Sequence, residues 1–111
     1  MAALFDADVL VEPLVRRARA GDRIAPVGME GHRKLTDVMR EAGIPTDARK
    51  EATIVTDARG EVIWVPGVLR SKEAPVGPLT RSVWAFWIVR GEDAQLQGDA
   101  TGVTLGSQED E

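Results

Sequence analysis

Apolar residues recur along the chain with two different periods, and each period predicts a different kind of element. One set recurs at intervals of three and four residues and comprises Leu35, Val38, Met39 and Ala42. This spacing is typical of one buried face of an α-helix. Gly43 follows where a left-handed residue often ends a helix, and Pro45 blocks continuation. The pattern predicts a helix over about residues 33–42.

Short runs of β-branched and aromatic residues predict strands on both sides of this helix. They are LVEPLV at 10–15, ATIVTD at 52–57, EVIWVP at 61–66 and LTRSVWAFWIV at 79–89. The two central runs are joined by DARG, where Gly60 suits a hairpin turn. TDARKE, at 46–51, predicts a short helical turn. The order predicts an α+β domain with a small, mostly antiparallel sheet and one main helix packed on it.

The aromatic residues lie mostly inside these apolar runs. They are Phe5, Trp64, Trp84, Phe86 and Trp87. Exposed aromatics on a sheet can stack on bases, but residues within apolar strands usually pack in the core. We therefore expect core packing.

Charge is distributed unevenly in a chain whose formal net charge is -4. Residues 16–70 hold 11 cations and 8 acids, whereas residues 91–111 hold six acids and no cation. The middle of the chain is therefore mildly basic. We predict a folded domain at 1–90 and an acidic, largely mobile tail at 91–111.

Composition restricts the class of protein. A length of 111 residues suits one domain, and the absence of cysteine excludes disulfides and thiolate chemistry. No apolar run approaches the roughly 18 residues needed to span a membrane, and the N-terminus carries acids where a secretory signal carries cations. We expect a cytoplasmic protein that does not contact a membrane.

Candidate catalytic and metal-binding residues are few. His32 is the only histidine and has no evident nucleophile partner. Asp6 and Asp8 form a pair too small to define a metal site. The stretch GMEGHRKL lacks the spacing of a phosphate-binding P-loop. We assign no catalytic residue and no metal ligand.

The stretch RRARAGDRIAPVGMEGHRKL, at 16–35, is the strongest candidate for a binding site. Arg33 and Lys34 fall in the first turn of the predicted helix, where cations oppose the helix dipole, so an external anion would relieve them. Gly31 allows a phosphate close to the backbone. Further arginines surround the AGD turn and comprise Arg16, Arg17, Arg19 and Arg23. The alternative is that these cations pair with neighbouring acids or only solvate the surface.

Several motifs in order resemble the C-terminal domain of the tRNA(Ile)-lysidine synthetases. They are FDAD, then VRRARAGDRIAPVGMEGHRKLTDVMREAGIPTDAR, then GEVIWVPG, and together they extend over about residues 5–90. The family's arginine-rich turn, helix start, I-P-x-x-x-R segment and W-V-P-G strand end match Arg16 to Arg23, Gly31 to Leu35, Ile44 to Arg49 and Trp64 to Gly67. Ala18 and Ala20 depart from the family pattern in the turn.

This resemblance implies a function for the whole family. Lysidine synthetases use ATP and Mg to ligate lysine to the wobble cytidine of a minor isoleucine tRNA, and the ATP-binding loop belongs to an N-terminal domain. The chain lacks that loop, so the resemblance implies a tRNA-recognition domain without cofactor or catalysis of its own, which docks the acceptor stem. The implied tRNA-binding residues are Arg16, Arg17, Arg19, Arg23, Gly31, Arg33, Lys34 and Arg49.

A second function remains open. The domain could instead be a protein-interaction module that docks the catalytic domain or another partner through strand edges or the acidic tail, without binding RNA.

Overall fold

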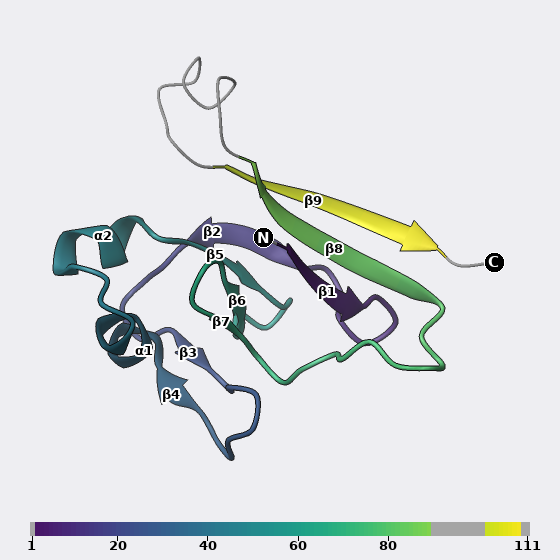
Figure 1. Ribbon diagram of the computed structural model, residues 1–111, viewed down its shortest axis with the longest axis horizontal. Helices are drawn as coiled ribbons and strands as arrows, with labels where there is room; N and C mark the ends of the chain where they lie inside the picture. Colours follow the sequence, from purple (N-terminus) through teal and green to yellow (C-terminus); the bar gives the residue numbers. More distant parts are fainter. Residues whose placement is uncertain (1, 90–101, 110–111) are drawn as a thin grey trace.

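The computed structural model describes residues 2–89 and 102–109, which form two sheets and a pair of short helices (Figure 1). The strands are β1 (Ala2–Asp6), β2 (Leu14–Arg17), β3 (Arg23–Ile24), β4 (Arg33–Lys34), β5 (Thr53–Thr56), β6 (Val62–Val65), β7 (Leu69–Arg70), β8 (Ser82–Val89) and β9 (Gly102–Glu109). The helices are α1 (Leu35–Glu41) and α2 (Thr46–Glu51). The predicted α+β class is confirmed.

The strands divide into two sheets. The smaller sheet has the order β1-β8-β9, and the larger has the order β2-β5-β6-β3-β4 with β7 paired to β6. All described pairings are antiparallel except that of β3 with β6. The hairpin predicted at 52–66 is present as β5 and β6, with Gly60 at a φ of +92°. The pairing is therefore mostly antiparallel, as predicted, but the strands form two sheets and not the single sheet expected.

The strands β5 and β6 form the central layer of the fold. All four residues of β6 are buried, because this strand is covered on both faces. On one face Ile63 and Trp64 pack against Phe5 and Phe86 of the smaller sheet. The rings of Phe5 and Phe86 meet edge to face, with centroids 5.7 Å apart. This aromatic cluster joins the two sheets.

On the other face of the larger sheet, α1 closes a second apolar cluster. Leu35, Val38 and Met39 are at most 4% exposed and pack against Ile54 and other strand residues. These are three of the four positions that the apolar period selects; the fourth, Ala42, is the exposed C-cap residue. Burial of a side chain of this size contributes about 1.5–3 kcal/mol, so the apolar face holds a helix that is too short to be stable alone.

Most aromatic residues lie in the core, as expected. Phe5, Phe86 and Trp64 are buried, and the Trp84 indole N–H donates to the Leu10 carbonyl oxygen at 3.1 Å. Trp87 is the exception, because it is 38% exposed. Its position on β8 has the opposite parity to Trp84 and Phe86, so its side chain leaves the sheet on the outer face.

The start of α1 differs from the prediction. Arg33 and Lys34 form β4, and the helix begins at Leu35, with Lys34 as an extended N-cap residue. The reason is that β4 pairs with β3 and holds the chain extended up to this point. The argument that these two cations destabilise the first helical turn is therefore wrong. That turn contains Asp37, whose charge suits the helix dipole.

The end of α1 agrees with the prediction. Gly43 has a φ of +83°, and its N–H donates to the Arg40 carbonyl oxygen at 3.0 Å. The Ile44 N–H donates to the Met39 carbonyl oxygen, also at 3.0 Å. These two bonds form a Schellman motif. The helical turn predicted at 46–51 is present as α2.

Two strands near the chain ends were not predicted. β1 pairs with β8 from Ala2↔Trp87 to Asp6↔Val83, and β9 pairs with the other edge of β8. β9 falls within the predicted tail, where the sequence shows no sustained apolar period. Pairing with β8 supplies its backbone hydrogen bonds instead. The remainder of that tail lies outside the described residues, so its mobility stays a prediction, as does the domain boundary at residue 90.

Candidate functional site

The arginine-rich turn between β2 and β3 is organised by one partly buried ion pair. Asp22 accepts hydrogen bonds from both terminal nitrogens of Arg16, at 3.0 and 2.8 Å. The two side chains are only 16% and 8% exposed. Asp22 also accepts from the Arg19 N–H at 2.7 Å. Arg16 therefore holds the turn in place, and its guanidinium is largely covered.

The ionisation of Asp22 reflects these contacts. Burial by itself opposes the charged carboxylate, but the hydrogen bonds from Arg16 and Arg19, and the charges of both side chains, outweigh it. The result is that the pKa of Asp22 is lowered from its ordinary value. The turn is thus built around a carboxylate that is charged at neutral pH.

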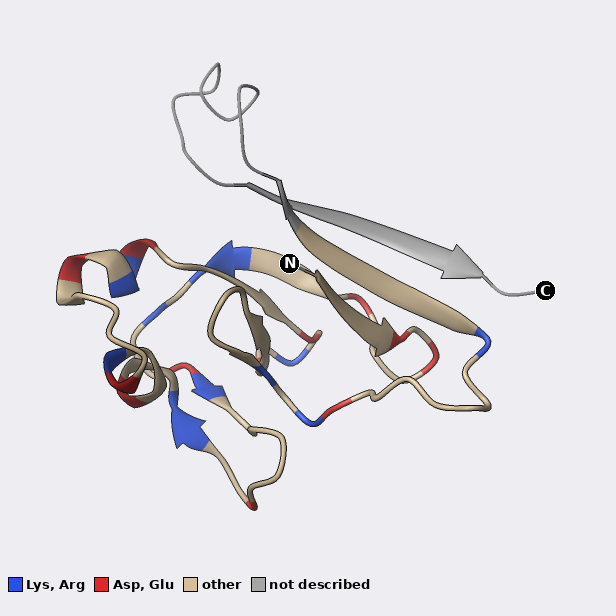
Figure 2. Ribbon diagram, in the orientation of Figure 1, with Lys and Arg blue, Asp and Glu red and all other residues tan. Residues whose placement is uncertain are grey.

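Pairing of β3 with β4 places the two basic loops on one face of the molecule. Arg23 lies directly opposite Lys34, and the Leu35 N–H donates to the Asp22 carbonyl oxygen at 2.9 Å. Residues directly opposite in an antiparallel pair project from the same side of the sheet. Figure 2 shows the blue ribbon of β3 and β4 beside α1, at the end of the molecule that carries the helices. The strand pair thus brings the turn before β3 next to the residues before α1.

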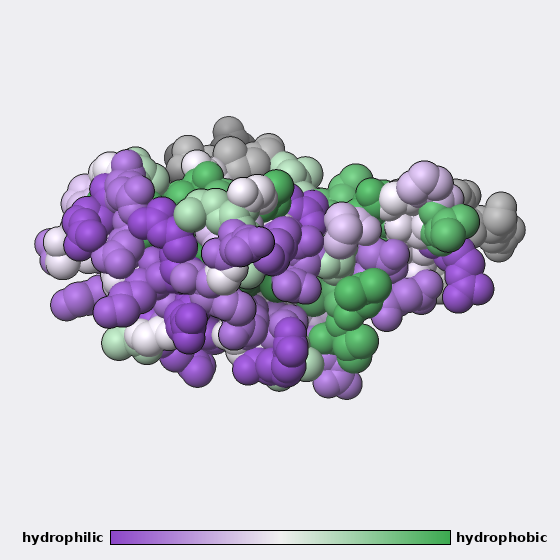
Figure 3. Space-filling view, turned by 90° about the horizontal axis from the view of Figure 1, so that it is seen from below, coloured by the Kyte–Doolittle hydropathy of each residue, from purple (hydrophilic) through white to green (hydrophobic). Residues whose placement is uncertain are grey.

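Two neighbouring depressions lie on this face. The first, of about 560 Å³, is lined by Ala20, Gly21, Asp22, Arg23, His32, Lys34 and Thr36. The second, a pit of about 160 Å³, is lined by Ala18, Arg19, Ala20, Leu35, Thr36, Met39, Arg49 and Lys50. Ala20 and Thr36 line both, so the two depressions adjoin. In Figure 3, hydrophilic residues gather at the end of the molecule that carries the helices.

Five cations around these depressions have no ion-pair partner in the part of the chain that the structure describes. They are Arg19, Arg23, Lys34, Arg49 and Lys50, and we call them the basic surface. Of these, Arg49 uses its Nε to donate to the Ile44 carbonyl oxygen at 2.7 Å. The basic surface is an arrangement that attracts an extended anion.

Two other predicted binding residues are paired with acids. Arg17 contacts Glu51 at 2.7 Å in a pair with both side chains more than 60% exposed. Arg33 is ion-paired with Glu41 at the far end of α1. Its partner across the strand pair is buried Ile24, so Arg33 and Lys34 leave the strand on opposite sides. Arg33 therefore lies apart from the first depression.

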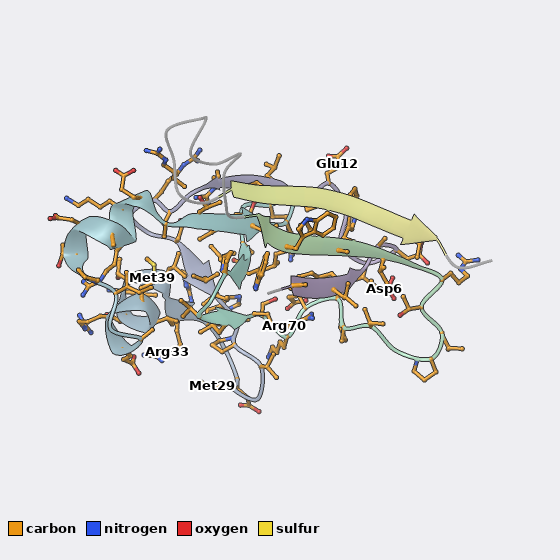
Figure 4. All side chains as sticks on the ribbon, turned by 45° about the horizontal axis from the view of Figure 1, so that its top comes forward. Asp6, Glu12, Met29, Arg33, Met39 and Arg70 are labelled. Carbon is orange, nitrogen blue, oxygen red and sulfur yellow. The ribbon has the colours of Figure 1, made fainter. Side chains whose placement is uncertain are left out.

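Gly31 has a turn role rather than a position in either depression. It belongs to the loop that joins β3 and β4, and its φ of +74° is a conformation that glycine adopts without strain. Val27 and Met29 in the same loop are 61% and 48% exposed. Figure 4 shows Met29 at the tip of this loop, away from the helices. The loop thus exposes two apolar side chains beside the charged residue Glu30.

Lys50 was not among the residues selected from the sequence. It follows Arg49 at the end of α2, and this RK pair in a short helical turn is a signal that could have been used. No sequence signal identifies Leu35 and Met39 as residues at the base of the pit. Their helical spacing is the same as that of any residue that packs in the core.

The remaining candidates have structural roles. His32 Nε2 lies 3.2 Å from a carboxylate oxygen of Glu61. Asp6 Oδ1 accepts from the Asp8 N–H at 2.8 Å in a turn that ends β1. Within the described residues, no group of three or more histidines or acids is placed to bind a metal ion. In the same part of the chain, no helix is long and apolar enough to cross a membrane.

Comparison with known proteins identifies the family of this fold. The family model described as the TilS substrate C-terminal domain matches residues 14–84, more than half of the chain. The chain belongs to this family. The resemblance to the C-terminal domain of the lysidine synthetases is thereby confirmed, and the matched residues of this TilS C-terminal domain include the whole basic surface.

Curated relatives agree with the TilS assignment. A tRNA(Ile)-lysidine synthase from Symbiobacterium thermophilum is 42% identical over 79 residues, 70% of this chain and 16% of that protein. The bifunctional protein TilS/HprT from Listeria monocytogenes is 41% identical over 69 residues, 61% of this chain and 11% of that protein. A tRNA(Ile)-lysidine synthase from Bacillus subtilis is 44% identical over 57 residues, which are 51% of this chain and 12% of that protein. The chain thus spans less than a fifth of these relatives.

Solved structures support the same fold. A crystal structure of a TilS C-terminal domain superposes with a TM-score of 0.60 at 32% identity, covering 97% of this chain and 69% of that chain. An N-terminal fragment of the phenylalanyl-tRNA synthetase beta-subunit from Pyrococcus horikoshii has a TM-score of 0.62 at 21% identity. The match covers 76% of this chain and 26% of that chain. The second match concerns the fold alone.

Proposed function

We propose that this domain binds the acceptor stem of a tRNA as the recognition part of a tRNA(Ile)-lysidine synthetase. The observation that carries the proposal is the basic surface, whose five cations form no ion pair in the described residues. Each exposed, unpaired cation gains more from a phosphate than a paired one, because no existing contact has to be broken.

The chemistry of the surface suits a double-stranded RNA. Proteins recognise A-form stems mainly through phosphates, 2′-hydroxyls and shape. Arg23 and Lys34 project together from the β3–β4 pair, and Ala20 and Thr36 connect them to the second group of cations. The distribution over one turn, one strand pair and α2 provides several contacts along a phosphate backbone.

In this proposal the individual predicted residues act differently. Arg19, Arg23, Lys34 and Arg49 contact phosphates directly, together with Lys50. Arg16 positions the turn through Asp22, and Gly31 permits the loop between β3 and β4. Arg17 and Arg33 bind RNA only when their ion pairs with Glu51 and Glu41 are broken. We place the ATP- and Mg-dependent ligation of lysine in the part of the lysidine synthetases that this chain does not cover.

Salt dependence of RNA binding tests the proposal. An acceptor-stem minihelix titrated with the purified domain should bind with an affinity that falls steeply as salt rises. Each phosphate neutralised contributes about 0.7–0.9 to the slope of log affinity against log salt, so contacts from most of the basic surface give a slope of about 3 to 4 in magnitude. Undetectable or salt-independent binding would contradict the proposal.

A second candidate function rests on the outer face of the smaller sheet. Leu4 and Trp87 are 46% and 38% exposed there, beside half-buried Val83 and Ala85. An apolar sheet face of this kind suits contact with another protein domain, and the chain spans only 16% of a matched lysidine synthase. If the rest of such an enzyme docks on this face, Trp87→Gln should weaken the association between the two parts without changing RNA binding.

A further inference from the structure

The pit beside the basic surface has a composition that phosphate contacts alone do not require. Its base is apolar and lies over Ala18 and over Leu35 and Met39, each of which is only 1% exposed, where β2 ends against α1. Figure 4 shows Met39 between the two helices. Three cations, Arg19, Arg49 and Lys50, line the pit around this base. A site for phosphate alone needs only the cations.

The size of the pit restricts its occupant. Its volume of about 160 Å³ is close to that of an apolar cavity of about 150 Å³ that accommodates one benzene molecule. It is smaller than the roughly 300–1,000 Å³ of sites for drug-sized ligands. One planar ring fits, and a larger molecule has to remain partly outside.

The positive charges around the pit indicate which chemical group accompanies the ring. None of the three cations has an ion-pair partner in the described stretch of chain. An apolar base enclosed by unpaired cations complements a planar ring that carries an anion close by. A nucleotide has this chemistry, with a base for the pit and phosphates for the cations.

A base inside a stem cannot enter such a pit, because it is paired and stacked between its neighbours. We propose that the pit holds one unpaired base at the end of the RNA whose stem lies on the basic surface. This inference rests on the proposed function. The pit then distinguishes the end of a stem from its interior, whereas the other cations bind any part of the phosphate backbone.

A set of minihelices that differ only at their ends tests this inference. The stem is used blunt, with a four-nucleotide 3′ extension, or with the same extension at the 5′ end. Insertion of one base predicts binding roughly 5- to 150-fold tighter for an extended RNA, equivalent to the 1–3 kcal/mol typical of one protein-bound base. Abasic nucleotides placed one at a time keep the phosphates of the extension. One abasic position should abolish the gain, while the others leave it.

Substitutions that fill the pit with a larger side chain test the same inference from the protein side. Ala20→Met extends a side chain from the exposed turn into the pit, and Ala18→Met does so from its base. Both should lose the gain from the extension, measured for each variant as the ratio of its affinities for the extended and blunt stems. Ala48→Met, on an exposed position of α2 outside the pit, is the matched control and should keep the gain. Should Ala18→Met fail to fold, Ala20→Met still decides the question.

The outcomes separate the two proposals. Equal affinity for blunt and extended stems, with a steep salt dependence for both, overturns the base pit and leaves stem binding intact. A gain that survives every abasic position, or that survives Ala20→Met, also overturns the pit. Absence of binding to all the RNAs overturns the proposed function itself.

Discussion

The guanidinium of Arg16 donates hydrogen bonds to both carboxylate oxygens of Asp22, six residues further along the chain. The backbone of Asp22 meanwhile accepts from the Leu35 N–H at 2.9 Å. One aspartate therefore connects the end of β2, the turn before β3 and the start of α1. These are the elements that present the basic surface.

Replacement of Asp22 by asparagine should destabilise the domain at neutral pH by about 2 kcal/mol, since hydrogen bonds to charged groups contribute about 1.5–3 kcal/mol. The change leaves the partly buried guanidinium of Arg16 without its counter-charge. Chemical denaturation at pH 7 measures the effect. Asp47→Asn, on an exposed position of α2 with no ion pair within the described residues, is the control and should change little.

The same pair predicts a pH dependence. Because the pKa of Asp22 is lowered in the folded state, the folded domain binds fewer protons at this group than the unfolded chain. The stabilisation is therefore complete above the unfolded value of about 3.9 and is lost as pH falls through the lower folded value. The stability gap between the parent and Asp22→Asn should narrow below about pH 4. A gap that stays constant down to pH 2 would contradict this assignment.

Charge reversal on the basic surface should weaken RNA binding without unfolding the domain. Arg23→Glu and Lys34→Glu each remove a phosphate contact and add a repulsive charge, so the salt slope should fall by about one per variant. Exposed charges contribute no more than about 1 kcal/mol to stability. Minihelix titrations over a salt series measure both effects.

The control for these reversals is Arg81→Glu. Arg81 directly precedes β8, at the end of that strand away from the helices, and contacts Asp8 at 3.5 Å (Figure 1). The change in net charge is identical to that of Arg23→Glu. Equal losses of affinity at the two positions would indicate a general charge effect and refute a localised RNA site.

Gly21 should be required for its backbone conformation and not for lack of space. Its φ is +89°, and a Cβ built there meets no atom within 4 Å. Gly21→Ala should therefore cost about 1 kcal/mol through left-handed strain alone. Gly77 has equally open surroundings without a positive φ, so Gly77→Ala should not destabilise the domain. Thermal unfolding of the two variants distinguishes strain from a steric effect.

Arg70 should stabilise the junction of the two sheets. Its guanidinium donates to the carbonyl oxygens of Leu4, Ser71 and Glu73 and lies 4.0 Å from the centre of the Phe5 ring. Arg70→Met should cost about 2–3 kcal/mol, since it removes these charge-assisted bonds. Arg59→Met, at a side chain 77% exposed, should change stability by less than about 0.5 kcal/mol. Similar losses for both would show that Arg70 is not a junction residue.

The local elements were predictable where the chain itself encodes them. The apolar period of α1, the Gly43 stop and the Asp57–Gly60 turn of the β5–β6 hairpin all depend on neighbours within a few residues. The strand β1 was not predictable in this way, because its pairing partner β8 lies at the other end of the domain sequence. The same holds for the start of α1, where an extended strand pair overrides the charges and moves the helix start to Leu35.

The sequence by itself determined the α+β class, the family and the basic stretch at 16–35, because these depend on periodicity, motif order and composition. Only the tertiary structure decided which of its arginines are free. Arg16 is covered by Asp22 and Arg33 is drawn to Glu41, whereas Arg23 and Lys34 are brought together without an acidic partner in the described residues. The physical reason is that ion pairing depends on distances of a few ångströms between side chains, which are set by strand register and not by spacing along the chain.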